Sequence, residues 1–220
     1  MDTFRTVLST GKLAQITQAL PLPLQHGRWK RLYSLTRDGA SFTTLLDKVQ
    51  GYQFTLLALR TTKGEVCGGF AAREWKAQKI SGFYGTGQSF LFSLVDDEVD
   101  RRTKVRVTES MSTVDFILDH LLHVCSVEVC AIARAPRIHQ VLKIYKWTGK
   151  NEYFQLCSVS DQRLAFGGGG VDGNFGLCVE RDFACGSSGY CETYGNEPLA
   201  REPTFHVEDM EVYGISSACF

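Results

Sequence analysis

The feature that most constrains this chain is a series of short apolar runs separated by glycines, which is densest in its last third. The runs cover 142–147, 153–158, 163–166, 174–180 and 210–215. Four consecutive glycines follow the third of them, at 167–170. Short strands at this spacing, with few helical segments between them, are typical of antiparallel sheets that pack face to face. The sequence therefore predicts an α+β fold, a sandwich of two antiparallel β-sheets with peripheral helices.

Earlier in the chain, two apolar runs form a predicted hairpin. They cover 54–60 and 66–72. Gly64, in the short segment between them, supplies the positive φ that a tight turn needs. Gly68 and Gly69 interrupt the second run, which predicts a bulge or a close approach by another backbone. A third run, 88–94, is apolar on both alternating faces, so we expect a strand that is buried on both sides.

Helical signals are fewer and shorter. Ser41 is a typical N-cap, and apolar residues at helical spacing follow it until Gly51 stops the pattern, which predicts a helix over 42–49. A second apolar stripe predicts a helix over 114–125. The first thirty residues carry a weaker pattern that is interrupted by glycine and proline, so we expect one or two short helices there.

Composition excludes several classes of function. The 24 basic and 24 acidic residues balance, and the absence of a basic excess argues against a nucleic-acid-binding domain. No run of 18 apolar residues occurs, so we expect no membrane-spanning segment. The first residues, MDTFR, lack the features of a secretory signal, so we expect a cytoplasmic location.

The chain has eight cysteines, and their spacing does not suggest a metal or redox motif. They are Cys67, Cys125, Cys130, Cys157, Cys178, Cys185, Cys191 and Cys219. None belongs to a C-x-x-C pair, and a cytoplasmic protein keeps its thiols reduced, so we expect all eight to be free. Among the histidines, His120 and His123 share a face of a predicted helix without a third ligand, so the sequence predicts no metal site.

The four glycines at 167–170 raise the question of a phosphate-binding loop. Such a loop needs Gly-Lys-Ser/Thr after its spacer, whereas Val171 and Asp172 follow here. We expect the glycines to let the chain turn tightly between strands, with one backbone close to another. The pair Gly85 and Gly87 is a weaker candidate for the same reason, and the sequence predicts no cofactor.

Cys191 carries the one enzymatic hypothesis that we consider. A nucleophilic cysteine needs a histidine within hydrogen-bond reach and surroundings that lower its pKa. His206 is the candidate base, and the backbone of 186–189 is a candidate anion nest. The alternative, which we favour, is a partly buried cysteine in a strand and an ordinary surface histidine. An exposed Cys191 in contact with a histidine would distinguish the two.

Glu192 follows this cysteine, and two roles are open to it. Paired with another carboxylate, such as Glu74 or Glu211, it could act as an acid or a base. We expect instead that it is structural, accepting backbone N–H bonds that hold the loop 186–196 in place. We also expect Trp75 and Trp147 to be core and hairpin residues rather than ligand platforms.

Seven segments occur in an order that is more informative than any one of them. They read RLYSLTRDGASF at 31–42, TLLALRTTKGEVCGGFAAREW at 55–75, FYGTGQSFLFSL at 83–94, IYKWTGKNEYFQLC at 144–157, LAFGGGG at 164–170, GSSGYCETYGNEPL at 186–199 and FHVEDMEVYGI at 205–215. Together they resemble the TLDc domain family, which oxidation-resistance proteins and nuclear-receptor-coactivator-like proteins share. The resemblance implies a sandwich of antiparallel sheets, protection against oxidative stress and binding to the vacuolar-type proton pump (V-ATPase). It implies no agreed catalytic residues.

The resemblance also suggests how the chain is divided. We expect a helical N-terminal extension over 1–30 and a TLDc-like domain over 31–220. In the family, a strand of the YKWTG type follows soon after the strand of the FLFSL type, whereas here 95–143 intervene. We interpret that segment as a helical insertion containing the predicted helix 114–125, since insertions at hairpin tips are usually tolerated.

From these arguments we predict a non-enzymatic TLDc interaction module whose partner is the V-ATPase. The alternative is a thiol- or peroxide-handling enzyme that uses Cys191, and a weaker one is direct scavenging of oxidants by the cysteines. We expect contacts from 186–196, from 167–173 and from the inserted helix. The motif residues with a predicted structural or contact role are Gly68, Gly69, Trp75, Gly85, Gly87, Trp147, Gly149, Gly167, Gly168, Gly186, Ser187, Ser188, Gly189, Cys191, Glu192, Gly195 and Asn196.

Overall fold

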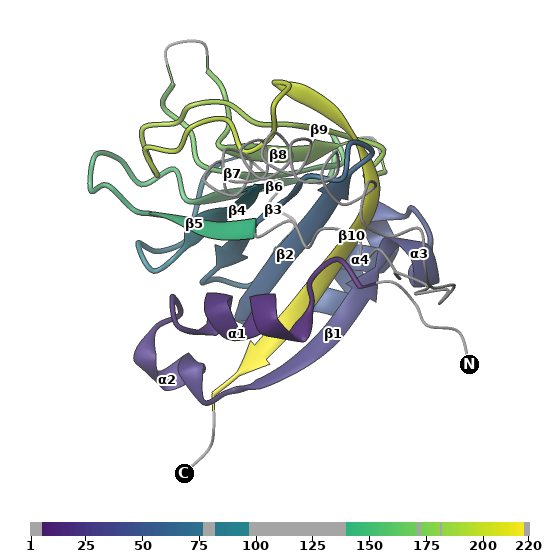
Figure 1. Ribbon diagram of the computed structural model, residues 1–220. Helices are drawn as coiled ribbons and strands as arrows, with labels where there is room; N and C mark the ends of the chain where they lie inside the picture. The colour runs from purple at the N-terminus through teal and green to yellow at the C-terminus, as the bar shows by residue number, and fades with distance from the viewer. Residues whose placement is uncertain (1–5, 77–81, 97–139, 171–172, 181, 218–220) are drawn as a thin grey trace, which may run out of the picture. The chain divides into compact units, whose positions relative to one another are not determined.

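The computed structural model describes residues 6–76, 82–96, 140–170, 173–180 and 182–217, and it confirms the predicted α+β sandwich (Figure 1). The helices in this part of the chain are α1 (Thr10–Thr17), α2 (Leu22–Gln25), α3 (Leu35–Asp38) and α4 (Phe42–Val49). The strands are β1 (Arg28–Ser34), β2 (Phe54–Thr61), β3 (Val66–Ala71), β4 (Phe90–Asp96), β5 (Gln140–Lys146), β6 (Gln155–Ser158), β7 (Arg163–Phe166), β8 (Leu177–Glu180), β9 (Cys185–Ser187) and β10 (Thr204–Ser216).

One long strand, β10, belongs to both sheets. Its residues from Val207 to Ile215 pair with β2, whereas Thr204, Phe205 and His206 pair with β9. The register with β2 shifts just after Val207, and a bulge of this kind bends a strand. The larger sheet therefore has the order β5-β4-β3-β2-β10-β1, and the smaller has the order β10-β9-β8-β7-β6. In Figure 1, β10 is the yellow strand that passes from one sheet to the other.

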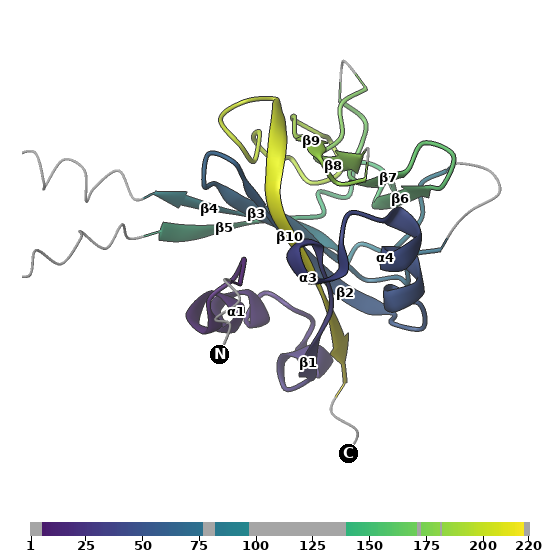
Figure 2. The ribbon, with the colours of Figure 1, turned by 90° about the vertical axis from the view of Figure 1, so that its right-hand side faces the viewer.

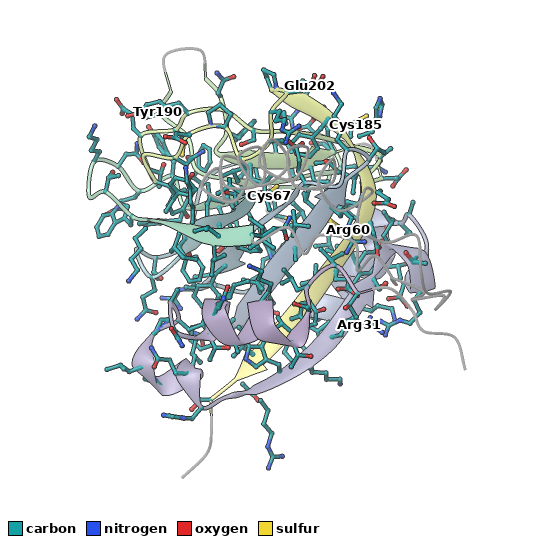
Figure 3. The ribbon with its side chains drawn as sticks, viewed as in Figure 1. Arg31, Arg60, Cys67, Cys185, Tyr190 and Glu202 are labelled. Carbon is teal, nitrogen blue, oxygen red and sulfur yellow. The ribbon has the colours of Figure 1, made fainter. Side chains whose placement is uncertain are left out.

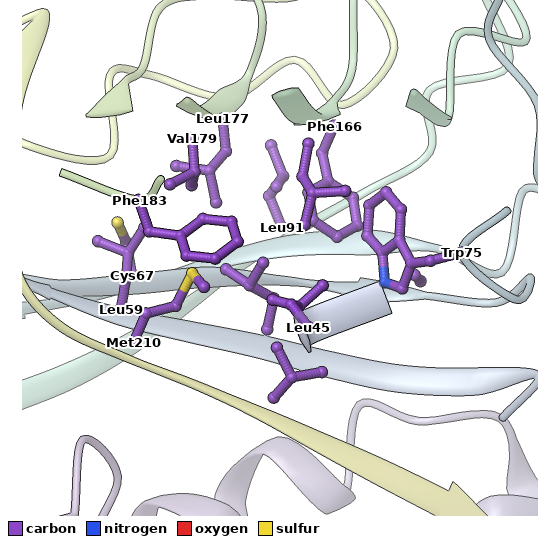
Figure 4. Close-up of a cluster of buried hydrophobic side chains, with 14 of the residues drawn as sticks. Leu45, Leu59, Cys67, Trp75, Leu91, Phe166, Leu177, Val179, Phe183 and Met210 are labelled. Atoms are coloured by element: carbon purple, nitrogen blue, oxygen red, sulfur yellow. The ribbon is translucent and has the colours of Figure 1, made fainter. Parts of the chain in front are cut away.

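The main core lies between the two sheets (Figure 4). Leu57 and Leu59 of β2 point into it and meet side chains such as Phe166 from the smaller sheet. Leu56 and Ala58, which alternate with them, lie in a second cluster on the outer face of the larger sheet. Strand β2 is thus buried on both faces, which is why its sequence is continuously apolar.

Helices α1 and α2 cover that outer face. Leu8, Ile16 and Leu24 from the N-terminal segment are buried in one cluster with Phe70 of β3 and Phe92 of β4. Figure 2 shows α1 on one side of the larger sheet and β6 to β9 on the other. The alternating apolar residues of β4 therefore have partners on both faces, as the sequence predicts.

A buried carboxylate adds a polar link between the N-terminal segment and this sheet. Glu211 is fully buried and accepts hydrogen bonds from Arg31 Nη1 at 2.7 Å, from the Val7 backbone N–H at 2.9 Å and from the Tyr213 hydroxyl at 2.7 Å. A buried charge is tolerated when it is paired and hydrogen-bonded in this way. The residues before β1 are therefore attached to β10 by polar as well as apolar contacts.

Several local predictions are confirmed. The Ser41 hydroxyl accepts a hydrogen bond from the Thr44 backbone N–H at the start of α4. Strands β2 and β3 form the predicted hairpin, with Gly64 at φ +82° in its turn. A Cβ atom on Gly68 would meet a backbone carbonyl oxygen of β2 and, at 2.7 Å, the Phe92 ring. This is the close approach that the glycine pair predicted.

The sequence did not predict β1, α3 or β9. Strand β1 carries charged residues and is only half-buried over its first four positions, because it lies at the edge of its sheet. The segment 186–196 was predicted as a loop, but strand β9 reaches into it, and Gly186 packs against the Phe205 ring of β10. Strand β8 begins at Leu177 rather than at 174, and β10 begins at Thr204 rather than at 210.

The predicted helix 114–125 lies outside the described residues. The limits predicted for the insertion, at about 95–143, stay a prediction. The limit predicted for the N-terminal extension, at residue 30, stays a prediction as well.

Candidate interaction site

Three loops from different hairpins meet beside the smaller sheet, and we call them the glycine-loop cluster. They are 147–153, 167–170 and 186–196. The Thr148 backbone N–H donates to the Thr193 carbonyl oxygen at 2.9 Å, which joins the first loop to the third. The Glu192 backbone N–H donates to the Gly168 carbonyl oxygen at 3.1 Å, which joins the third to the second. Tyr190, labelled in Figure 3, marks the outer side of this cluster.

Asn196 and Ser188 hold the loop 186–196 in shape. The amide of Asn196, which is fully buried, donates to the carbonyl oxygens of Gly189 and Glu197, both at 2.9 Å. The buried Ser188 hydroxyl donates to the Gly176 carbonyl oxygen at 2.6 Å and accepts from the Leu199 backbone N–H at 2.9 Å. The loop is thereby fixed by side chains that solvent does not reach.

Thr193 connects all three loops. Its fully buried hydroxyl accepts a hydrogen bond from the Gly168 backbone N–H at 3.0 Å. The same hydroxyl donates its proton to Asn151 Oδ1 at 2.7 Å. The neighbouring Tyr194 donates its hydroxyl proton to the Phe154 carbonyl oxygen at 2.9 Å. Hydrogen bonds of this density stabilise one loop arrangement over others.

Close packing requires two glycines here, Gly167 in the cluster and Gly87 beside it. The indole ring of Trp147 lies directly against Gly87, where a Cβ atom would overlap it. Gly167 has φ +75° and lies against Cys191 and, at 2.9 Å from the position of a Cβ atom, against the Tyr194 ring. The glycines therefore serve tight turns and close contacts, as expected.

The structure separates the predicted motif residues into two groups. Gly68, Gly69 and Trp75 belong to the sheets and the main core, where Trp75 donates its indole N–H to the Thr55 hydroxyl at 3.0 Å. The others lie in the glycine-loop cluster or beside it: Gly85, Gly87, Trp147, Gly149, Gly167, Gly168, Gly186, Ser187, Ser188, Gly189, Cys191, Glu192, Gly195 and Asn196.

The loop-holding role predicted for the Glu192 carboxylate is not seen among the residues that the structure describes. Its side chain is exposed, and within the described residues its carboxylate accepts no hydrogen bond. Its hydrogen bonds within the described cluster come from its backbone, for example from its carbonyl oxygen, which accepts from the Thr148 hydroxyl at 2.6 Å. The buried side chains of Asn196, Ser188 and Thr193 fulfil the role that was expected of Glu192.

Cys191 does not have the geometry of a nucleophile. It is fully buried and donates its thiol proton to Asn196 Oδ1 at 3.0 Å. Burial raises the pKa of this thiol, which disfavours the reactive thiolate. His206, the histidine that the enzymatic hypothesis requires, lies against Cys185 instead, with 3.8 Å between Sγ and Nδ1.

Three aromatic side chains of the cluster are exposed. The exposed fractions are 40% for Trp147, 45% for Tyr153 and 47% for Tyr190. The rings of Trp147 and Phe154 pack edge to face at 5.4 Å, and the Trp147 indole N–H donates to a backbone carbonyl oxygen within its own hairpin. Trp147 is therefore the predicted hairpin residue, but it also presents part of its ring to solvent.

Sequence reasoning missed Thr193, Tyr153 and Tyr190. Thr193 lies in the segment CETYGN, and its position between Cys191 and Asn196 is the one sequence feature that could have indicated its role in the loop. Nothing in the sequence distinguishes exposed Tyr190 from buried Tyr194, because that difference depends on which loops pack together.

The described residues contain no group of three or more His, Cys, Asp or Glu side chains that could hold a metal ion. Cys67, Cys157, Cys178, Cys185 and Cys191 are free thiols. Among the helices that the structure describes, none is long and apolar enough to cross a membrane.

The fold and the glycine-loop cluster define a β-sandwich domain with a surface presented by loops. The family model of the TLDc domain matches residues 1–114 and 135–216, so the chain belongs to the TLDc domain family. The gap between the two matched ranges, 115–134, falls inside the predicted insertion.

The chain spans only part of the length of the relatives that it matches. Oxidation resistance protein 1 of Podospora anserina is 31% identical, over 86% of the chain and 54% of the relative. Oxidation resistance protein 1 and nuclear receptor coactivator 7 of Homo sapiens are 25% and 26% identical over 95% of the chain. The chain covers only 18% and 17% of these two human proteins.

Proposed function

We propose that this chain is a non-enzymatic TLDc interaction module that binds and regulates the V-ATPase and supports resistance to oxidative stress. The observation that carries the proposal is the glycine-loop cluster, which presents Trp147, Tyr153 and Tyr190 on a hydrogen-bonded framework. The module acts in the cytoplasm and reaches vacuolar or lysosomal membranes through its partner.

The physics of interfaces supports a contact role for this surface. Tryptophan and tyrosine are enriched among the residues that dominate binding energy, because they bury a large area at low cost in side-chain entropy. Loops that are already fixed by hydrogen bonds lose little further entropy on binding. Thr193 and Asn196 provide this ordering before any partner arrives.

Two further observations support the choice of role and partner. Relatives named for oxidation resistance support the link to oxidative stress. The V-ATPase as partner rests on the resemblance of the motifs to the TLDc family, which is an argument by analogy. The buried position of Cys191, together with the contact of His206 with Cys185 instead, supports a role without catalysis by Cys191.

The direct test adds the purified chain to isolated V-ATPase and follows co-migration on a gradient together with ATP hydrolysis. We expect binding and a changed rate of hydrolysis. In the double variant Tyr153→Ala/Tyr190→Ala, we expect the affinity to fall about tenfold or more, since central interface aromatics commonly contribute over 1.4 kcal/mol. Both side chains are exposed, so the fold should persist.

The matched control is Val159→Ala, which removes an exposed apolar side chain from the turn between β6 and β7. It should bind as the unmodified chain does. No binding and no rate change at micromolar protein would defeat the proposal. Peroxide turnover that Cys191→Ser abolishes would establish the enzymatic alternative instead.

A further inference from the structure

A surface cavity of about 450 Å³ lies outside the residues that the proposed function uses. Its lining comes from the turn after β2, from β8 and β9, and from the start of β10. It contains both a thiol, Cys185, and an imidazole, His206. Figure 3 labels Cys185 and Glu202, two residues of this lining, on the same side of the molecule.

The strand register brings Cys185 and His206 together. They are directly opposite partners in the antiparallel pairing of β9 with β10, and the side chains of such partners lie on the same face. Phe205 of the next pair is buried in the main core and also borders the cavity, and Cys185 and His206 both line the cavity. The distance from Cys185 Sγ to His206 Nδ1 is 3.8 Å. This contact is therefore set by the sheet and not by a loose loop.

Charges of both signs surround this pair. On its other side, Cys185 pairs with Glu180 of β8, whose carboxylate Arg163 binds through Nε at 3.2 Å and Nη2 at 3.0 Å. Lys63 and Glu202 form an ion pair on the rim of the cavity, and both side chains are more than half exposed. A small ligand that carries both an ammonium group and a carboxylate would find complementary charges here.

The other described cysteines are protected by burial. Burial raises the pKa of Cys157 to about 11 and that of Cys178 to about 12, and it also raises the pKa of Cys67 and Cys191. Cys185 alone among the described cysteines is not buried. A cysteine is modified selectively when its thiol is exposed and a proton acceptor lies beside it. Among the described cysteines, Cys185 meets both conditions.

We propose that Cys185 is a site of S-thiolation by small zwitterionic disulfides, with His206 as the proton acceptor. In the tautomer that carries its proton on Nε2, His206 Nδ1 takes the proton of the Cys185 thiol. Sγ then attacks one sulfur of the disulfide, a new S–S bond forms, the original S–S bond breaks, and the second half leaves as a thiolate. The disulfide is reduced as Cys185 is oxidised, so no further oxidant is needed. The proposal is independent of V-ATPase binding.

The test incubates the reduced full chain with glutathione disulfide and follows the adduct by intact mass and peptide mapping. We expect one glutathionyl group on Cys185 and none in Cys185→Ser. In His206→Gln we expect the initial rate to fall about tenfold or more, because the local base is lost. His26→Gln, which makes the same change at an exposed histidine after α2, should react at the unmodified rate.

A second part of the experiment tests whether the charges of the disulfide are recognised. Neutral hydroxyethyl disulfide should react several-fold more slowly with the unmodified chain than glutathione disulfide does. In Lys63→Met, the rates for the two disulfides should lie closer together. Mapping of the adduct to another cysteine, with Cys185 unmodified, would overturn the site. An unchanged rate in His206→Gln would overturn the role of the histidine, and equal rates for the two disulfides would overturn the class of ligand.

Discussion

Asn196 satisfies every polar atom of its amide without any contact with solvent. Its two donated bonds and the one it accepts from Cys191 all end on groups within the loop 186–196 or immediately after it. Glu192, four residues earlier, is charged and exposed, and among the described residues its hydrogen bonds to the cluster come from its backbone. At the scale of the residue, burial rather than charge therefore decides which side chain holds the loop.

Asn196→Ala should lower the free energy of unfolding by about 1–3 kcal/mol, because it removes the two hydrogen bonds that the buried amide donates and the one that it accepts from the buried Cys191 thiol. Glu192→Gln is the control, and its effect should stay within about 0.5 kcal/mol. Chemical denaturation of both variants measures the difference. If Glu192→Gln were the more destabilising of the two, the assignment of the loop-holding residue would be wrong.

At the scale of elements, Asp38 joins β1, α3 and α4. Its carboxylate accepts from Arg37 Nε at 2.9 Å and Nη2 at 2.7 Å, and from the Ser34 backbone N–H at 2.9 Å. Lys48 of α4 lies 3.2 Å from the same carboxylate. The hydrogen bonds from Arg37, followed by those from Ser34 and Lys48, hold the pKa of Asp38 well below its usual range.

This lowered pKa makes a contribution to stability that depends on pH. An acid whose pKa is lower in the folded state stabilises the fold above its ordinary pKa, and that stabilisation is lost as the pH falls through the folded value. Asp38→Asn should therefore lower the melting temperature by a few degrees near pH 7, and the two proteins should converge as the solution is acidified. Thermal unfolding at several pH values checks this. A gap that stays constant into strong acid would show that the charge of Asp38 is not responsible.

At the scale of the whole molecule, the N-terminal helices are part of the packing of the larger sheet. Leu24 is 2% exposed and lies in the outer cluster, while Leu22, in the same helix, is 77% exposed. Glu211 adds the hydrogen bond to the Val7 backbone N–H. Without this segment, the outer faces of β3 and β4 would expose Phe70 and Phe92 to water.

Leu24→Ala should lower the free energy of unfolding by about 2–5 kcal/mol, the usual cost of deleting a buried leucine side chain. Leu22→Ala makes the same chemical change in the same helix and should cost less than about 0.5 kcal/mol. Denaturant titration followed by fluorescence measures both. Equal, small effects would mean that 1–30 is a separable extension that does not contribute to the core.

The sequence by itself determined the antiparallel sandwich, the hairpin at Gly64 and the capped helix α4. These depend on local signals, because period-two apolar runs, turn glycines and an N-cap serine act on neighbouring residues. The tertiary structure alone decided that β10 is shared by both sheets and that the three glycine loops meet. It also decided that Cys185, rather than Cys191, contacts His206. Each of these depends on the register between strands far apart in the sequence, and register is set by the packing of the whole core.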